Sequence, residues 1–477
     1  MDLKSLVTAN ANERWLILAN FLRQVGMQGA YFLGILGYAA YGFGGIATIV
    51  MTIMLIVNIA NMVGSIIGGA IVDRIGPRKT ILYSSIAVVL ISLSALLTQG
   101  NVTAFAVFVA FFGLSTTILN TAFSSFAPYL EKGKVGLRRV NSFLTIGAFI
   151  ATVIGPAIGA IATGIFPVYS VFIILAVVTA AAALITIKVH EVYAPHLESE
   201  DDDDVQHETE KPNAEQDVVA ASEALAQAHG IQLTDPVRVT ETSITPGTAL
   251  AGRDLTKRQV KEKANPFKEA MEGWHIIRQS RSLRYYLMVA VAMIFGFGAF
   301  DALEPIFFQQ VLAVDISVLG WIYALAGVGL IIGVVALALF PIKWVNSRLL
   351  IWVLIICGFG AVAYVATTNL WIVAVGQLIT GVAFGIFDPL MRTMVQADSP
   401  LKAVGRVLGT INMISLGLLL IPLVIAPWLS NLWGVQPVLI LAGATPIIFG
   451  LLLFPEGRRI DKATASSRNI ESLDVLE

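Results

Sequence analysis

The sequence predicts an all-α membrane protein with twelve transmembrane helices in two pseudo-symmetric halves of six. Of its 477 residues, 56% are hydrophobic and 13% are charged, with a mean hydropathy of +0.79. A soluble domain is about a quarter charged. Apolar runs of the roughly 20 residues that cross a bilayer recur along the whole chain. Basic residues return at every second connection between these runs, which indicates the direction of each crossing.

Twelve apolar runs are expected to be transmembrane helices. They lie at 15–40, 46–72, 81–98, 102–127, 142–166, 168–188, 284–312, 318–340, 350–367, 370–394, 407–429 and 437–454. Basic residues occur in the connections 73–80, 128–141, 341–349 and 396–406 and are absent from the alternate ones. Cytoplasmic loops carry this excess of Lys and Arg, so we expect both termini in the cytoplasm of a bacterial cell, with the chain in the cell membrane.

The chain divides into four parts. We expect an N-terminal half at 1–189, a linker at 190–264, a C-terminal half at 265–455 and a cytoplasmic tail at 456–477. The linker holds 16 acidic and seven basic residues and too little apolar surface to fold alone, so it is predicted to be disordered.

The C-terminal half should begin with an amphipathic helix. Asn265 and Pro266 are typical of an N-cap and a first helical residue. Apolar residues then recur at helical spacing and Arg residues follow, which predicts a helix on the inner membrane face. The two halves also look related, because 138–156 and 405–422 both start with Arg-Val after a basic loop and reach a proline. Such a weak internal repeat is typical of transporters.

A charged loop after the second span carries the clearest family signal. Its residues are Gly69, Asp73, Arg74, Gly76, Arg78 and Lys79. In spacing and position they resemble the loop between spans two and three of the major facilitator superfamily, although Pro77 replaces a usual basic residue. With twelve spans and a long central loop, the resemblance covers nearly the whole chain. It implies a transporter that works by alternating access.

The same loop predicts a conformational latch. The resemblance implies that spans two and eleven meet across the halves, which would bring Asp73 to the N-terminus of span eleven near Arg406. A helix N-terminus stabilises an anion by about 0.3–2 kcal/mol. Asp73 would then hold the inner side shut when the protein opens outward.

Three glycine pairs at one-turn spacing predict close helix packing. They are Gly64 with Gly68, Gly155 with Gly159, and Gly329 with Gly333. They fall on spans two, five and eight, which the resemblance places at the interface between halves.

Span five also bears on the direction of transport. Gly155, Pro156 and Gly159 resemble the centre of a motif associated with antiporters in this superfamily, with Ala151 and Ala160 in place of two glycines. The segments before spans five and seven are similar to the drug:proton antiporter branch that includes macrolide exporters and enterobactin-exporter-like proteins. The resemblance implies export.

Two charged residues lie at similar depth on helices that line the cavity in this superfamily. Arg23 is roughly 12 Å and Asp388 roughly 9 Å from the inner ends of spans one and ten, from the 1.5 Å rise per residue. They could pair with each other. Equally, Asp388 could pair with Arg392, one turn further along its own helix.

Asp301 and Glu304 lie three residues apart, on one face in the outer half of span seven. Two carboxylates this close disfavour each other's ionisation, and burial disfavours it further, as a reversible proton carrier needs. They could instead line a wet vestibule and stay ionised. Asp388 is the reserve candidate. Aromatic residues on the same cavity helices would suit a bulky apolar cargo, or would merely pack: Tyr31, Phe123, Phe297, Phe300, Phe384 and Phe387.

We therefore expect a monomeric, proton-coupled exporter of a hydrophobic or amphipathic, drug-like small molecule. Its partners are the cargo, protons and the lipid bilayer, with no nucleic acid, cofactor or metal. No enzyme is expected, because the sequence has no ATPase-type phosphate loop and no zinc-ligand spacing. The alternatives are an importer of a small metabolite, a lipid-moving relative, or a transporter-like receptor or membrane scaffold.

Overall fold

The described part of the chain is helical throughout. The computed structural model describes residues 11–130, 134–190, 266–341, 344–400 and 403–474. Eleven helices in these ranges are long and apolar enough to cross a membrane. A further crossing is made by α2 (Ala11–Gly29), η1 (Ala30–Gly37) and α3 (Tyr38–Tyr41), which follow one another without a break. The predicted fold is confirmed. The predicted linker lies outside the described residues, apart from His190.

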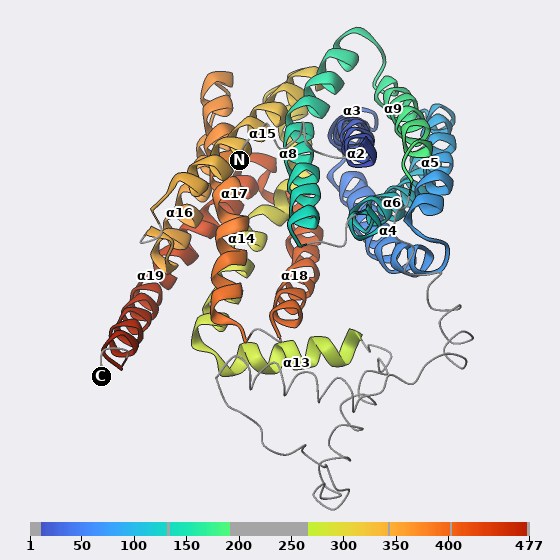
Figure 1. The fold of residues 1–477 in the computed structure, drawn as a ribbon. Helices are drawn as coiled ribbons and strands as arrows, with labels where there is room; N and C mark the ends of the chain where they lie inside the picture. The colour runs from blue at the N-terminus through green and yellow to red at the C-terminus, as the bar shows by residue number, and fades with distance from the viewer. Residues whose placement is uncertain (1–10, 131–133, 191–265, 342–343, 401–402, 475–477) are drawn as a thin grey trace, which may run out of the picture. The chain divides into compact units, whose positions relative to one another are not determined.

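The N-terminal half, coloured blue to green in Figure 1, contains the first six crossings. After α3 come α4 (Ala47–Ile75), α5 (Pro77–Ser94), η2 (Ala95–Thr98), α6 (Val102–Ser124), α7 (Ala127–Leu130), α8 (Lys134–Ile165) and α9 (Ser170–Ile187). Asn101 caps α6, because its side chain accepts a hydrogen bond from the backbone N–H of Ala104.

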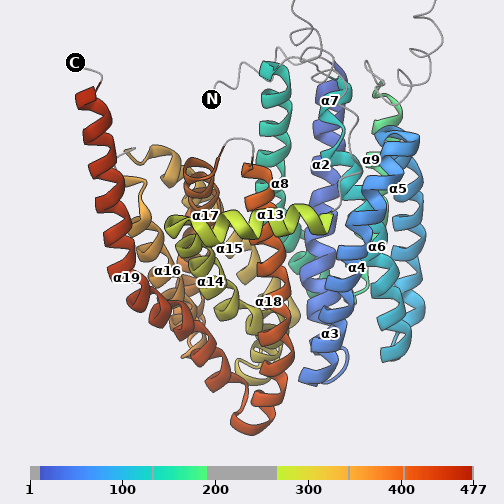
Figure 2. The ribbon, with the colours of Figure 1, turned by 90° about the horizontal axis from the view of Figure 1, so that it is seen from below.

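The C-terminal half, coloured yellow to red, repeats this order after a short helix (Figure 2). Its elements are α13 (Pro266–Gln279), α14 (Arg281–Ile306), η4 (Phe307–Val311), α15 (Ile316–Leu339), α16 (Ser347–Val365), α17 (Leu370–Asp398), α18 (Val404–Trp433) and α19 (Val435–Asp474). The helix α13 begins at Pro266, as its sequence predicts. The first crossing of each half contains a π-helical segment, η1 or η4, and such segments occur frequently at functional sites.

The last helix extends further than the sequence suggested. A tail was expected from residue 456, but α19 continues to Asp474. Two acidic residues tie this extension to the bundle. Glu456 accepts a 3.0 Å hydrogen bond from Arg281 at the start of α14. Asp461 accepts from the backbone nitrogen of Ser347, at 2.9 Å, at the start of α16. These contacts explain why the chain stays helical beyond the membrane.

Replacing Asp461 should therefore destabilise the protein. Asp461→Ala removes an acceptor from the unpaired N–H groups that begin α16, and losing such a cap costs about 0.5–2 kcal/mol. We expect a lower thermal unfolding midpoint for the purified protein in detergent. Asp461→Asn keeps one acceptor oxygen in place, so its unfolding midpoint should lie between those of Asp461→Ala and the wild type. Equal midpoints for Asp461→Ala and the wild type would show that the contact contributes nothing.

The two halves meet at one end of the bundle. We call the end that holds the α4–α5 and α15–α16 connections the basic end, and the other the opposite end. At the opposite end, Tyr41 donates a 2.8 Å hydrogen bond to the carbonyl of Val314, and Gln310 donates one of 3.0 Å to the carbonyl of Gly45. The first contact joins the first crossing of the N-terminal half to the loop after the first crossing of the C-terminal half. The second contact does the reverse.

The hydrophobic cores show the same asymmetry. One core cluster combines residues of both halves, such as Met54 of α4 with Leu423 of α18. The other, which includes Tyr285 and Val407 near the basic end, contains residues of the C-terminal half alone. The described part of the protein is thus closed between its halves at the opposite end and separated at the basic end.

The glycine pairs pack within each half, so the expectation that they form the interface is wrong. A Cβ added at Gly64 would lie 2.8 Å from the carbonyl oxygen of Leu114 on α6. One at Gly155 would lie 2.6 Å from that of Val25 on α2. The third pair, Gly329 and Gly333, packs against α17. One-turn spacing indicates close approach, but it does not identify the neighbouring helix.

A different glycine pattern brings α8 and α15 together across the halves. A Cβ at Gly320 would lie 3.0 Å from the carbonyl oxygen of Pro156, and one at Gly327 would lie 2.7 Å from that of Thr152. Spans five and eight therefore do form an interface, through glycines seven residues apart on α15.

Candidate functional site

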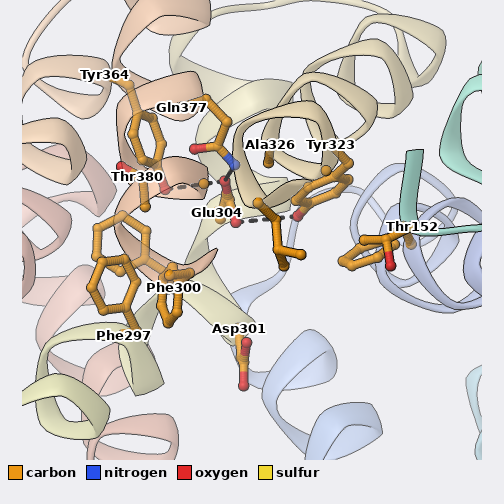
Figure 3. Close-up of a pocket in the computed structure, with 15 residues that line it drawn as sticks. Thr152, Phe297, Phe300, Asp301, Glu304, Tyr323, Ala326, Tyr364, Gln377 and Thr380 are labelled. Atoms are coloured by element: carbon orange, nitrogen blue, oxygen red, sulfur yellow. Dashed lines mark hydrogen bonds between the residues drawn. The ribbon is translucent and has the colours of Figure 1, made fainter. Parts of the chain in front are cut away.

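A cavity of about 330 Å³ lies between the halves. The N-terminal half contributes Phe32 of η1 and Thr152 of α8, and the other lining residues come from α14, α15 and α17, with Tyr364 from α16. Aromatic side chains form much of the wall, as Figure 3 shows. Phe297, Phe300 and Phe384, which the sequence had marked, are among them.

Glu304 is the centre of a polar cluster in this cavity. Its side chain is buried and accepts three hydrogen bonds (Figure 3). Tyr364 donates at 3.0 Å and Gln377 at 3.3 Å to Oε1, and Tyr323 donates at 3.3 Å to Oε2. The three donors come from α16, α17 and α15 and are all neutral. Among the described residues, no cation pairs with this carboxylate.

Gln377 leaves one acceptor unused. Its Oε1 atom is buried and has no hydrogen-bond partner among the described residues, while its Nε2 donates to Glu304. A half-turn of the amide would exchange the two atoms, and the assignment of amide N and O depends on the surrounding hydrogen bonds. The amide can therefore present a donor to an ionised Glu304 or an acceptor to a protonated one.

Asp301 lines the same cavity but stands apart from the cluster around Glu304 (Figure 3). Its side chain is partly exposed and makes no hydrogen bond to a described residue. The sequence placed both carboxylates on one helical face, and the structure brings both to one cavity. Only Glu304 is surrounded by fixed donors.

The remaining membrane charges are separate from this cavity. Asp388 pairs with Arg392 at 2.9 Å, which is the second of the two alternatives that the sequence left open. Arg23 is buried elsewhere and donates to Asn20 at 2.9 Å and to Asn120 at 3.0 Å. Its guanidinium also lies 5.0 Å from the ring centre of Phe123. The structure does not bring Arg23 and Asp388 together.

The charged loop lies at the basic end. Gly76 joins α4 to α5 with φ of +79°, a conformation that favours glycine. Arg78 donates a 2.7 Å hydrogen bond to the carbonyl of Ile187 at the end of α9. Asp73, Arg74 and Lys79 are exposed, and a Cβ added at Gly69 would meet no described atom within 4 Å.

Arg406, the expected neighbour of Asp73, has another acidic partner. Glu272 of α13 pairs with it at 2.8 Å. The helix α13 approaches closely there, because a Cβ added at Gly273 would lie 2.6 Å from the carbonyl oxygen of Arg406. Sequence reasoning missed this pair, since nothing local connects residues 134 positions apart.

The antiporter-like motif lies where three helices cross. Gly155 faces α2, and Gly159 faces η1, where an added Cβ would lie 3.2 Å from Leu33. Pro156 directs its carbonyl toward Gly320 of α15. The motif therefore joins contacts within the N-terminal half to the interface between halves.

Sequence comparison identifies the family. The sequence pattern described as Major Facilitator Superfamily matches residues 16–415. A search of curated proteins found no match.

Solved structures show the same fold at low sequence identity. A mutant of the peptide transporter POT in complex with sulfate gives a TM-score of 0.64 at 15% identity, covering 94% of both chains. A mutant of the nucleoside transporter NupG gives 0.63 at 10% identity, covering 93% of this chain and 99% of that one. Since the family pattern spans most of the sequence and the fold agrees with it, this chain belongs to the major facilitator superfamily and is a membrane transporter.

Proposed function

We propose that the protein is a proton-coupled secondary active transporter that exports a small hydrophobic or amphipathic molecule. The observation that carries this proposal is Glu304, a buried carboxylate in a cavity between the halves, held by three neutral donors. An ionisable group inside a membrane protein is costly and is a functional candidate by default. No cation among the described residues holds this carboxylate in its charged form, as a reversible proton carrier requires.

The surroundings of Glu304 suit both forms. When ionised, it accepts hydrogen bonds from Tyr323, Tyr364 and Gln377. When protonated, it would donate to Gln377 after a half-turn of that amide, whose oxygen is otherwise unpaired. Asp301, in the same cavity and more accessible, would receive the proton first or pass it on.

The aromatic wall supports a cargo with an apolar body. Six aromatic residues line the cavity, and such rings contribute large contact areas with few rotatable bonds. Ligand pockets are typically apolar with a few fixed polar groups, which is the composition found around Glu304.

The conformation supports alternating access. The excess of basic residues in its connections favours a cytoplasmic position for the basic end. Because the halves are separated there and joined at the opposite end, we assign this structure to the inward-facing state. We infer export from the residues Gly155, Pro156 and Gly159, which resemble an antiporter motif.

Transport measurements in vesicles test the proposal directly. The purified protein would be reconstituted with a pH-sensitive dye inside, and a panel of hydrophobic, amphipathic, peptide and nucleoside compounds would be added outside. Proton movement opposite to that of a cargo supports antiport. Movement of both in one direction would show symport and import. Cargo flux that is unchanged when an ionophore collapses the pH gradient would exclude proton coupling.

We also propose that Asp73 stabilises the outward-facing state. Closing the basic end would bring α4 to the N-terminus of α18, where an anion gains about 0.3–2 kcal/mol. Asp73→Asn should therefore shift the population toward the inward-facing state by about 2- to 30-fold. Glu272→Gln removes the pair that Arg406 makes in the present structure and should shift the population the other way.

Spin labels would measure both effects. Cysteines replacing the exposed residues Ala70 of α4 and Gly409 of α18 would report the separation of the halves at the basic end, in a protein whose sole native cysteine, Cys357, is buried. An Asp73→Asn protein with the wild-type distance distribution and wild-type transport would end the latch proposal.

A further inference from the structure

Arg23 is a buried charge that has no role in the proton coupling proposed above. It is the only Asp, Glu, Lys or Arg in residues 15–72, 81–127 and 142–187, which make up nearly all of the six crossings of the N-terminal half. The membrane interior of this half thus contains a cation and no acidic residue at all. Charges at this depth are costly and usually pair with an opposite charge.

The side chain is fixed but not neutralised. Arg23 is 2% exposed, and both of its hydrogen bonds to described residues leave from Nη2, toward the amide oxygens of Asn20 and Asn120. The ring of Phe123 lies beside it. Its Nε atom is buried and has no hydrogen-bond partner among the described residues. All three neighbours are neutral, so the positive charge is held in place without compensation.

The donors that remain free on the guanidinium have a defined chemical preference. Nη2 uses both of its hydrogens on Asn20 and Asn120, so Nε–H and the two N–H groups of Nη1 are left for the oxygens of a carboxylate, sulfonate or phosphate. Such charge-assisted pairs are about twice as strong as neutral hydrogen bonds. The amides of Asn20 and Asn120 hold Nη2 and so fix the guanidinium, which lowers the entropy lost when an anion binds.

The residues around Arg23 lie toward the basic end. Asn120 is exposed and lies one turn before α6 ends at the basic end, where the halves are separated. The nearest acidic residue along the chain, Glu13, pairs with Arg139 at 2.6 Å, and Asp388, which the sequence offered as a partner, pairs with Arg392. They are therefore not available as counter-ions in this conformation.

We propose that Arg23, positioned by Asn20 and Asn120, binds the anionic group of an amphipathic cargo entering from the basic end. This rests on the transport function proposed above, and it defines the cargo further as an organic acid with an apolar body. The cation lies in one half and the carboxylates Asp301 and Glu304 in the other.

Three matched probes test the proposal. Naphthalene-2-sulfonate, naphthalen-2-ylmethanol and naphthalen-2-ylmethylamine share one aromatic body and carry an anionic, a neutral and a cationic head. Their binding to the purified full-length protein, in nanodiscs of neutral phosphatidylcholine, would be measured by titration calorimetry. We expect the sulfonate to bind at least about tenfold more tightly than the other two, as expected for hydrogen bonds to charged groups.

Variants locate the binding. Arg23→Gln and Asn120→Ala should weaken sulfonate binding, the first by about tenfold or more. Arg23→Lys should recover part of it, because it keeps the charge but has fewer N–H donors in a less fixed arrangement. Arg459→Gln, an exposed arginine on α19, is the control and should bind like the wild type. Equal binding of the three probes, or undiminished sulfonate binding by a folded Arg23→Gln protein, would overturn the proposal.

Two further arms separate the sources of the anion. Inorganic sulfate that binds as tightly as the organic sulfonate would overturn the amphipathic cargo and show a simple ion site. Sulfonate binding that is abolished in nanodiscs containing anionic phosphatidylglycerol would assign the site to a lipid headgroup instead. Because calorimetry needs no pH gradient, Arg23-dependent binding can hold even if proton coupling fails.

Discussion

Glu304→Gln is expected to abolish cargo movement driven by a pH gradient while the protein still folds and binds cargo. Glutamine has the shape of the protonated acid. Its oxygen can accept from Tyr364 and Gln377 and its NH2 can donate to the hydroxyl of Tyr323, so the hydrogen-bonded cluster persists. It cannot release a proton. The transporter would then be held in the form that normally follows proton uptake.

Two assays distinguish this from a general loss of function. Uphill transport should fall to the background level, whereas exchange of labelled for unlabelled cargo at equal pH should continue. Cargo binding to the wild type should weaken as pH falls, because protons and cargo compete. In Glu304→Gln this pH dependence should be flat, with an affinity close to that of the wild type at low pH.

Comparison with neighbouring carboxylates sharpens the assignment. Asp301→Asn should also impair coupling, because it lines the same cavity. Asp388→Asn is the matched control, since Asp388 is exposed and pairs with Arg392 outside that cavity. Normal uphill transport by both Glu304→Gln and Asp301→Asn would exclude these residues as the coupling site and direct attention to Asp388.

The sequence predicted features that depend on local spacing. Apolar runs and basic connections gave the twelve crossings, because both signals are read within about 20 residues. Asp301 and Glu304 share a helical face, and they line one cavity as expected. The ion pair of Asp388 with Arg392 is likewise a contact between adjacent turns of one helix.

Features that join distant helices could not be predicted. Glu304 receives its hydrogen bonds from residues 19, 60 and 73 positions away. The sequence around a tyrosine or glutamine in an apolar run does not indicate which helix that side chain faces. The same limit explains why the neighbours of the glycine pairs were predicted wrongly, since those neighbours lie within each half.

Gly327→Val is expected to disfavour the conformation seen here and shift the population toward the state open at the opposite end. A Cβ at this position would lie 2.7 Å from the carbonyl oxygen of Thr152 and 2.9 Å from its carbonyl carbon. These are backbone atoms that cannot rotate away, so α8 and α15 would have to separate. Overpacking of this kind typically costs about 1–3 kcal/mol, which corresponds to a population shift of roughly 5- to 150-fold.

The shift should appear as a change in access to the cavity. With Cys357 replaced by serine, a cysteine at Thr380 on the cavity wall would be labelled with a membrane-impermeant maleimide from either side of oriented vesicles. Gly327→Val should increase labelling from the opposite end, decrease it from the basic end and slow transport. Gly417→Val on α18 is the matched control, because a Cβ there meets no described atom within 4 Å. Labelling that is the same for Gly327→Val and Gly417→Val would show that the contact between α8 and α15 does not control which end is open.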